Sequence, residues 1–191
     1  MNSTMFNTLL AAAAQAGKAY TPVEYLECTG TQYIDTGVAP DFAGGDEITV
    51  VWSGTSLTGN TVVFGSRTTT VRNGVYLTGS GLIIADGDGY QGLGAGSPLT
   101  VNDAEVVAGT HVYTMPRRVT CAFPMSLFCL NNGGSHTSYG STARIYEWTY
   151  KRNGQTAQHL IPALVGGVPC MWDTVTGSPL YNAGTGTFVY A

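Results

Sequence analysis

Short runs of β-branched and aromatic residues, separated by glycine turns, recur along this sequence from residue 23 to residue 190, and they constrain its fold more than any other feature. Residues 23–38, VEYLECTGTQYIDTGV, are predicted to form a strand, a tight turn at the Thr29-Gly30 pair and a second strand. Alternate side chains of a strand lie on opposite faces, and glycine supplies the positive backbone angles of tight turns. The pattern predicts an all-β fold.

Further strands are predicted wherever such a run ends at glycine, proline or asparagine. They cover residues 46–53, 60–64, 69–76, 82–85, 105–115, 119–130, 143–152, 155–165, 168–173 and 186–190. The Asn73-Gly74 and Asn153-Gly154 pairs predict hairpin turns, because Asn-Gly favours the turn that joins two antiparallel strands. Residues 86–97 and 131–135 are rich in glycine and are predicted to be loops, where ligands commonly meet a β protein.

Length and composition indicate one folded domain over residues 21–191. A β-sandwich of this size is ordinarily a single domain, and no spacer or charge run divides the segment. The formal net charge is −4, which argues against the basic face that nucleic-acid binding needs, and no apolar run is long enough to insert in a membrane. The sequence contains four cysteines, without the Cys-x-x-Cys spacing of zinc sites: Cys28, Cys121, Cys129 and Cys170. Free buried thiols are favoured, and one or two disulfides remain an alternative.

Residues 1–20 are a different kind of segment and are predicted to form a short helical arm. Apolar residues recur four apart, and Gly17 is placed to end the helix. The residues expected to contact a partner are Met5, Phe6, Leu9 and Leu10. A secretory signal peptide is the competing interpretation, because residues 9–14 are apolar and Ala14-Gln15-Ala16 resembles a cleavage site, although no Lys or Arg precedes the apolar run. We expect an arm that docks on another protein, with packing against its own domain as a further alternative.

Three parts of the chain carry a resemblance to a known family. They are residues 24–37 (EYLECTGTQYIDTG, here the front motif), residues 143–146 (ARIY), and residues 171–175 (MWDTV) with residues 181–188 (YNAGTGTF, here the rear motif). Over about residues 22–190 the chain resembles the concanavalin A-like, laminin-G-like jelly rolls of gut bacteria and their phages. The resemblance implies a sandwich of two curved antiparallel sheets whose first and last strands lie close together. That architecture serves glycan binding, hydrolysis and virion decoration alike.

The sequence lacks the common patterns of catalytic residues. Glycan hydrolases of the resembled superfamily carry carboxylates at alternate positions of one strand, as Glu-x-Asp-x-Glu, and that pattern does not occur here. Glu24 and Glu27 are three residues apart and are expected on opposite faces of a strand. The histidines are scattered, without a nucleophile motif beside them: His111, His136 and His159. We therefore expect that the chain is not an enzyme.

Binding candidates lie in the predicted loops. An aromatic face with a polar partner suits a sugar ring, and the residues of that kind are Tyr90, Asn131, Asn132 and Tyr139. The three tryptophans are expected in the core instead. Asp86 and Asp88 alternate with glycine as Ca²⁺ ligands do, but no Glu closes the loop at the expected distance, so an ordinary acidic turn is favoured and no cofactor is predicted.

Two functional hypotheses follow. The first is a non-enzymatic structural protein of a phage virion, such as a capsid decoration, head-fibre or tail-associated protein. It would display a lectin-like jelly roll, contact other virion proteins through the arm at residues 1–20, and form a homo-oligomer. The second is a carbohydrate-binding module or adhesin, secreted or on a bacterial surface, for which those residues would be a leader. The first predicts dependence on the arm, and the second predicts glycan binding without it.

Overall fold

The computed structural model describes residues 19–41, 44–54, 61–69, 72–78, 81–87, 89–92, 109–113, 121–137 and 143–191. These residues form strands in two sheets, joined by turns and short connections, and none of them belongs to an α-helix. The predicted all-β character is thereby confirmed for the described part of the chain. Of the predicted arm, only Ala19 and Tyr20 fall within that part, and Met5, Phe6, Leu9 and Leu10 lie outside it.

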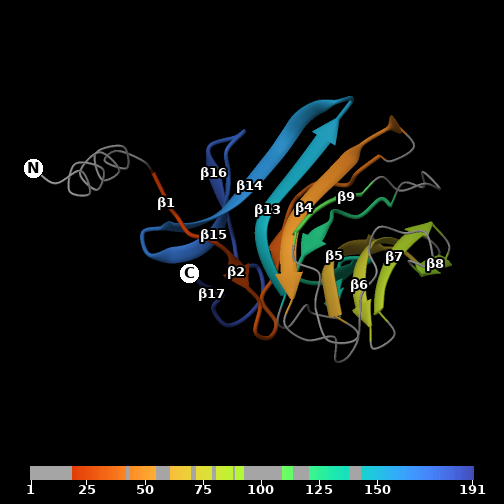
Figure 1. Ribbon diagram of the computed structural model, residues 1–191, viewed down its shortest axis with the longest axis horizontal. Coiled ribbons are helices and arrows are strands. Elements are labelled where there is room, and N and C mark those ends of the chain that lie inside the picture. Colours follow the sequence, from red (N-terminus) through yellow and green to blue (C-terminus); the bar gives the residue numbers. More distant parts are fainter. Residues whose placement is uncertain are drawn as a thin grey trace, which may run out of the picture.

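The strands divide between two sheets, which we name A and B. Sheet A contains β1 (Thr21–Pro22), β2 (Leu26–Glu27), β4 (Glu47–Gly54), β9 (Gly109–Tyr113), β13 (Ala143–Arg152), β14 (Gln155–Val165), β15 (Val168–Asp173), β16 (Ser178–Tyr181) and β17 (Val189–Tyr190). Sheet B contains β3 (Ile34–Asp35), β5 (Thr61–Arg67), β6 (Arg72–Thr78), β7 (Gly81–Gly87), β8 (Gly89–Gly92), β10 (Ser126–Leu127), β11 (Leu130–Asn132) and β12 (Ser135–Thr137). Figure 1 shows β4, β13 and β14 side by side in sheet A, and β5 to β8 in sheet B. The described strand pairs are antiparallel, except that β11 runs parallel to β5.

Strands β13 and β14 form the hairpin that the sequence predicts, with the predicted bounds. Asn153 and Gly154 have φ values of 51° and 75°, and two positive φ angles in succession are what a type I′ turn requires. Along β13 the buried positions change from odd to even numbers between Ile145 and Trp148. The pairing with β4 has a bulge there, which inserts one extra residue and re-aims the side chains that follow.

Residues 23–38 do not form the predicted hairpin, and this prediction is wrong. Strand β2 pairs with β13 and β17 in sheet A, whereas β3 pairs with β10 in sheet B, so the Thr29-Gly30 turn carries the chain from one sheet to the other. The buried side chain of Gln32 holds this crossover. Its Oε1 accepts a hydrogen bond from Thr29 N at 3.2 Å, and its Nε2 donates to Thr187 O at 3.1 Å. The amide thus takes the place of the hydrogen bonds of a hairpin ladder.

The Asn73-Gly74 pair is also not a turn, because both residues lie inside β6. A Cβ atom at Gly74 would lie 2.6 Å from Phe64 O and 2.8 Å from Gly65 Cα on the neighbouring strand. The glycine therefore serves the close approach of two backbones rather than a positive φ. The connection from β6 to β7 lies beyond the Thr78–Gly81 pair instead.

The two predicted loops contain strands. Residues 81–87 form β7, and residues 89–92 form β8, which pairs back onto β7 through Asp86 and Gly89. Asn131 and Asn132 belong to β11, and Gly133 and Gly134, with φ values of 63° and 92°, make the turn into β12. Strand β16 was not predicted. A turn at residues 174–177 returns the chain onto β15, to which β16 adds an edge strand.

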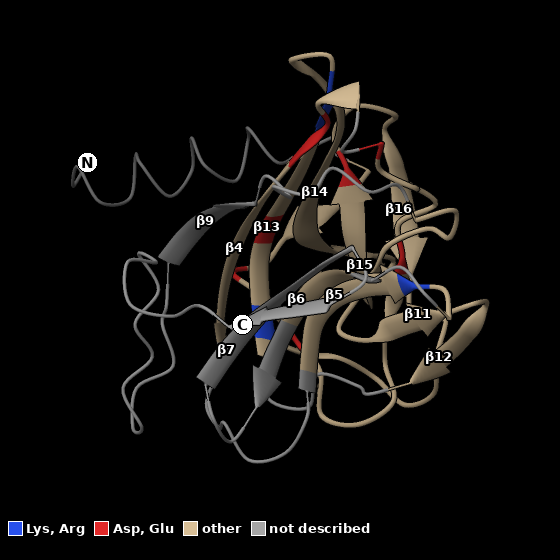
Figure 2. Ribbon diagram, turned by 90° about the vertical axis from the view of Figure 1, so that its right-hand side faces the viewer, with Lys and Arg blue, Asp and Glu red and all other residues tan. Residues whose placement is uncertain are grey.

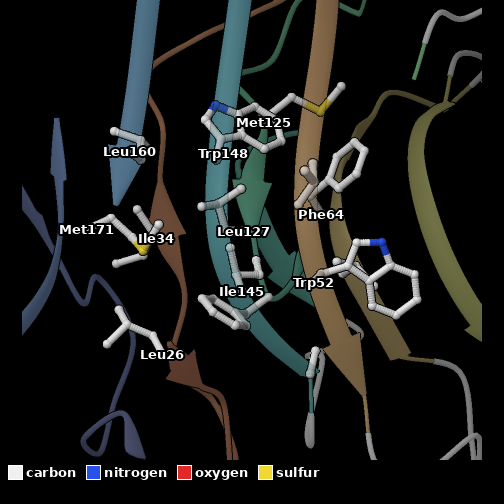
Figure 3. Packing of buried hydrophobic residues seen from close by; sticks show 14 of the residues in the cluster. Leu26, Ile34, Trp52, Phe64, Met125, Leu127, Ile145, Trp148, Leu160 and Met171 are labelled. Atoms are coloured by element: carbon white, nitrogen blue, oxygen red, sulfur yellow. The ribbon is translucent and has the colours of Figure 1, made fainter. Parts of the chain in front are cut away.

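The main core lies between the two sheets, in a β-sandwich-like arrangement. Figure 3 shows apolar side chains from both sheets meeting in one cluster. Phe64 of sheet B packs edge-on against Trp148 of sheet A, with 5.2 Å between ring centroids. The Trp148 indole Nε1 donates to Gln158 Oε1 at 3.2 Å, and Gln158 Nε2 donates to Thr36 O at 2.9 Å, so the buried indole N–H and the Gln158 amide both have hydrogen-bond partners. Trp52 and Trp148 are buried in this core as expected.

Charged residues are few and scattered in the described part of the chain (Figure 2). Three of the cations there pair with acids on neighbouring strands: Arg144 with Glu27, Lys151 with Glu47, and Arg152 with Asp46. Tyr150 also donates a hydrogen bond to the buried Asp46 carboxylate. These pairs connect β13 with β2, with β4 and with Asp46, which directly precedes β4.

Candidate functional site

The front and rear motifs meet in the structure, although about 150 residues separate them. Asn182 Oδ1 accepts hydrogen bonds from Tyr33 N at 3.2 Å and from Gly184 N at 2.9 Å, and Ala183 N donates to Tyr33 O at 2.9 Å. The Thr31 and Thr185 hydroxyl groups form a hydrogen bond with each other. These contacts join the crossover between the sheets to the loop between β16 and β17, so that the two segments form one unit.

Gly184 is the point of closest approach between the two motifs. A Cβ atom there would overlap the carbonyl oxygen of Thr31 and lie 3.0 Å from Tyr33 Cδ1. The rear motif therefore requires glycine at this position on steric grounds. The absence of a side chain also leaves room beside Tyr33.

A pocket of about 440 Å³ opens at this junction. Its lining residues are Thr31, Tyr33, His136, Ala183, Gly184 and Thr185. His136 comes from β12 of sheet B, and its imidazole stacks on the Tyr33 ring with 4.0 Å between centroids and 17° between planes. Small-molecule sites usually measure about 300–1,000 Å³ and combine apolar surface with a few fixed polar groups. The pocket falls within that size range, and its lining combines one aromatic pair with two hydroxyl groups.

The described lining of the pocket is uncharged at neutral pH. None of the described lining residues is Asp, Glu, Lys or Arg. Burial lowers the pKa of His136, although the nearby Asp35 carboxylate opposes that shift, so the imidazole is neutral at pH 7. The pocket therefore offers an aromatic pair, two hydroxyl groups and main-chain atoms to a ligand.

Asn131 and Asn132 lie next to this pocket but face other partners. Asn131 is buried, its Nδ2 donates to Pro124 O at 3.0 Å, and its Oδ1 accepts from Gly134 N at 2.9 Å. Asn132 Oδ1 accepts from Arg67 Nε at 2.8 Å. Both side chains hold the β11–β12 turn. Asn131 on β11 pairs with His136 on β12. The residue that lines the pocket is therefore His136, the strand partner of the predicted Asn131.

The other predicted site residues are placed by backbone alone or lie outside the described part. Tyr90 belongs to β8 and Asp86 to β7, and their side chains are not described. Tyr139 and Asp88 lie outside the described residues. A calcium site at Asp86 and Asp88 stays an alternative prediction. Among the described residues, no three His, Cys, Asp or Glu side chains gather as a metal site would require.

The residues that line the pocket were not predicted as a site from the sequence. The front and rear motifs carry the resemblance but contain none of the predicted binding residues, and His136 is one of the scattered histidines. The one signal that points to them is the resemblance, because it implies that the first and last strands lie close together. Thr-Gly-Thr occurs in both motifs, at residues 29–31 and 185–187, and these segments are brought together here.

Three polar residues on the outer face of sheet A form a hydrogen-bonded chain that resembles a catalytic triad. His159 Nδ1 lies 2.7 Å from Thr174 Oγ1, and His159 Nε2 lies 3.1 Å from Glu147 Oε1. The side chains of His159 and Glu147 are 31% and 45% exposed. Triads act in sites that exclude water and hold an oxyanion, so this open chain is better explained as support for the turn after β15. Thr174 N also donates to His159 O there at 2.8 Å.

Beyond His159 the outer face of sheet A becomes apolar. Strand partners lie on the same face, and the pairs Ile161–Trp172, Ala163–Cys170 and Cys170–Tyr181 define it. We call this surface the outer apolar face; its residues are Ile161, Ala163, Val165, Val168, Cys170, Trp172, Pro179 and Tyr181. Leu160 and Met171, on the opposite face, belong to the main core. Strands β14 and β15 are thus apolar on both faces.

Tyr20 covers part of the outer apolar face. Its ring stacks on Trp172 with 4.6 Å between centroids and 24° between planes. Immediately after it, β1 pairs with β14, and Val23 N donates to Pro162 O at 3.1 Å. Trp172 is thereby buried, but in a small cluster outside the main core. The expectation that all three tryptophans lie in the core is therefore not met by Trp172. The segment that follows the predicted arm is therefore fixed to this face.

Comparison of the chain with protein-family models, with curated proteins and with solved structures found no match. No helix that is long and apolar enough to cross a membrane occurs among the described residues. The four cysteines are all described, and each is free and buried, as favoured. Function is therefore inferred from the chain's own residues.

Proposed function

We propose that this chain is a non-enzymatic structural protein of a phage virion, which displays a jelly-roll domain and is attached or oligomerised through its N-terminal arm, residues 1–20. The observation that carries the proposal is the outer apolar face at the root of that arm. The resemblance to jelly rolls of phages and gut bacteria supplies the virion setting, and the two facing sheets of the described residues are compatible with that fold.

Along a strand of a sandwich sheet, apolar residues that point to the core ordinarily alternate with polar residues that point to water on the outer face. Strands β14 and β15 depart from this, since they are apolar on both faces. Tyr20 covers Trp172, whereas Val168 and Tyr181 remain 52% and 45% exposed. Covering half of such a side chain stabilises an interface by about 1 kcal/mol. This face therefore supports docking of a second copy of the chain beside the arm.

The fixed root of the arm supports the same proposal. Tyr20 and β1 hold the chain against β14 up to Ala19, and Glu24 N donates to Ala191 O, so both ends of the described region lie near one another. An arm that starts from a fixed point holds the domain in a defined position on its partner.

Solution mass by light scattering tests the proposal on the full chain and on a chain that begins at Ala19. We expect an oligomer for the full chain and a folded monomer for the shortened chain. Replacing Met5 and Leu9 by Ser should reproduce the loss, whereas replacing Asn2 and Asn7 by Ser should not.

The outer apolar face has a matched control of its own. Tyr181 and Tyr190 are 45% and 42% exposed, on the edge strands β16 and β17. Tyr181→Ser should weaken the oligomer, and Tyr190→Ser should leave it intact. If the full and shortened chains are both monomers of equal stability, the proposal fails. A carbohydrate-binding module or adhesin, which needs no arm, would then be the better assignment.

A further inference from the structure

We propose that the pocket between the front and rear motifs binds one or two neutral sugar rings, with the stacked Tyr33–His136 pair as the aromatic wall and the Thr31 and Thr185 hydroxyl groups as polar partners. Its lining residues differ from the predicted residues Asn131 and Asn132, which lie next to it. It does not depend on the arm or on the outer apolar face, so it goes beyond the assembly function proposed above.

The size of the pocket favours a small ligand. Its volume of about 440 Å³ lies toward the lower end of the range for small-molecule sites, and its wall is built from three segments that are far apart in the sequence, one of them from sheet B. His136 enters from β12, while Thr31 and Tyr33 belong to the crossover and Thr185 to the loop before β17. A single sugar ring or a disaccharide end would contact all three segments at once.

The chemistry of the lining favours a neutral polyol. A pyranose ring has an apolar C–H face and a rim of hydroxyl groups, so it needs an aromatic surface beside polar atoms. The Tyr33–His136 pair provides the aromatic surface, and the exposed Thr31 and Thr185 provide hydroxyl groups. Each hydroxyl can donate one hydrogen bond and accept two, so their mutual bond leaves capacity for a ligand. Among the described lining residues there is no Lys or Arg to pair with an acidic sugar.

The pocket is held in shape before any ligand arrives. The Asn182 side chain accepts hydrogen bonds from the Tyr33 and Gly184 amides, and the Gln32 side chain donates one to the Thr187 carbonyl. At Gly184 the backbones of the two motifs are in direct contact. A preformed site loses less conformational entropy on binding than a flexible one. Weak but specific binding is therefore expected, of the kind that becomes effective when many copies are displayed together.

The test uses the full chain, labelled with ¹⁵N, and follows amide shifts of Thr31, Tyr33, Gly184 and Thr185. The probes are the methyl glycosides of glucose, galactose, mannose and N-acetylglucosamine, each added to about 20 mM, a concentration that reveals millimolar affinity. We expect saturable shifts of these amides with at least one sugar. Glucuronic acid, as an acidic comparison, should bind at least about fivefold more weakly.

Two variants locate the site. Thr185→Val removes one hydroxyl and should weaken binding about five- to tenfold, as expected for one lost hydrogen bond. Thr187→Val is the matched control, because Thr187 is exposed in the same loop and only its carbonyl holds Gln32; it should bind like the parent chain. His136→Ala removes the ring on which Tyr33 stacks and should weaken binding by a similar factor.

Three results would overturn this assignment: no shift of the lining amides with any of the four sugars, equal affinity of the Thr185→Val and parent chains, or equal affinity for the acidic sugar. Light scattering on the same samples reports assembly separately. A monomeric full chain that still binds sugar would refute the assembly proposal alone, and an oligomer without binding would refute this one alone.

Discussion

Gly184→Ala should be among the most damaging single-methyl additions in the described part of this protein. The new Cβ atom would overlap Thr31 O and lie 3.0 Å from both the Thr31 carbonyl carbon and Tyr33 Cδ1. Two of these atoms are backbone, so rotation of a flexible side chain cannot relieve the clash. The rear motif must move away from the front motif, and that movement separates the hydrogen bonds between them.

The cost can be worked from those contacts. The Ala183 N–Tyr33 O and Tyr33 N–Asn182 Oδ1 bonds, at 2.9 and 3.2 Å, span the contact directly, and each contributes about 1 kcal/mol. Overpacking against a backbone that cannot yield adds about 1–3 kcal/mol. The free energy of unfolding should therefore fall by about 3–5 kcal/mol, which lowers the melting temperature by about 10 °C in a chain of this size.

Urea denaturation followed by tryptophan fluorescence measures this loss, with two glycine controls that separate its causes. Gly177 has a φ of 70° and nothing within 4 Å of its Cβ position, so Gly177→Ala should cost about 1–2 kcal/mol through backbone strain alone. Gly30→Ala would place its Cβ 3.7 Å from Gln32 Oε1, an ordinary contact, and should change stability by less than about 0.5 kcal/mol. If Gly184→Ala costs no more than Gly177→Ala, the two motifs do not meet as described.

Three further predictions concern single features of the fold. A double-mutant cycle of Tyr20→Ala and Trp172→Ala should give a coupling of about 0.5–1.5 kcal/mol in urea denaturation, and strictly additive losses would contradict the stack. Burial lowers the pKa of His136 from its usual 6.5, so the unfolded chain takes up the proton first and stability falls as pH drops below about 6.5. His136→Phe should therefore flatten the change in melting temperature between pH 7 and pH 5. An unchanged slope would refute the lowered pKa of His136. Burial raises the pKa of Cys170 to about 11 and all four thiols are buried, so a thiol reagent at pH 8 should label the native chain far more slowly than the denatured chain, whereas comparable rates would show exposed thiols.

Local pattern was sufficient where a turn and both of its strands agree. The Asn153-Gly154 hairpin was predicted with its bounds because two long strands flank a dipeptide that favours a positive-φ turn. The same dipeptide at Asn73-Gly74 does not form the predicted turn. Glycine is needed there because Phe64 and Gly65 on the neighbouring strand leave no space for a side chain. Sequence alone does not distinguish a glycine that permits a turn from a glycine that permits close packing.

The candidate site escaped prediction because it is entirely non-local. Tyr33, His136 and Gly184 come from a crossover, a short strand and a terminal loop, and each looks like ordinary turn or surface sequence by itself. The crossover itself was read as a hairpin, because a buried Gln32 side chain replaces the strand pairing there. A hydrogen bond that spans 155 positions along the chain leaves no periodic signal in the sequence. Only the expectation that the first and last strands lie together pointed toward this junction.

Strands β14 and β15 are more apolar than strands at the surface of a sheet need to be. A sheet that faces water needs apolar residues at alternate positions only, yet HLIPALV and VPCMWD are apolar at nearly every position. The main core accounts for Leu160 and Met171, and Tyr20 accounts for Trp172. Val168 and Tyr181 are left with about half of their surface in water. A second cover on the outer face of sheet A would explain the continuous apolar runs. The second copy proposed above, docked beside Tyr20, would supply that cover and would leave the pocket lining on the crossover and β12 unchanged.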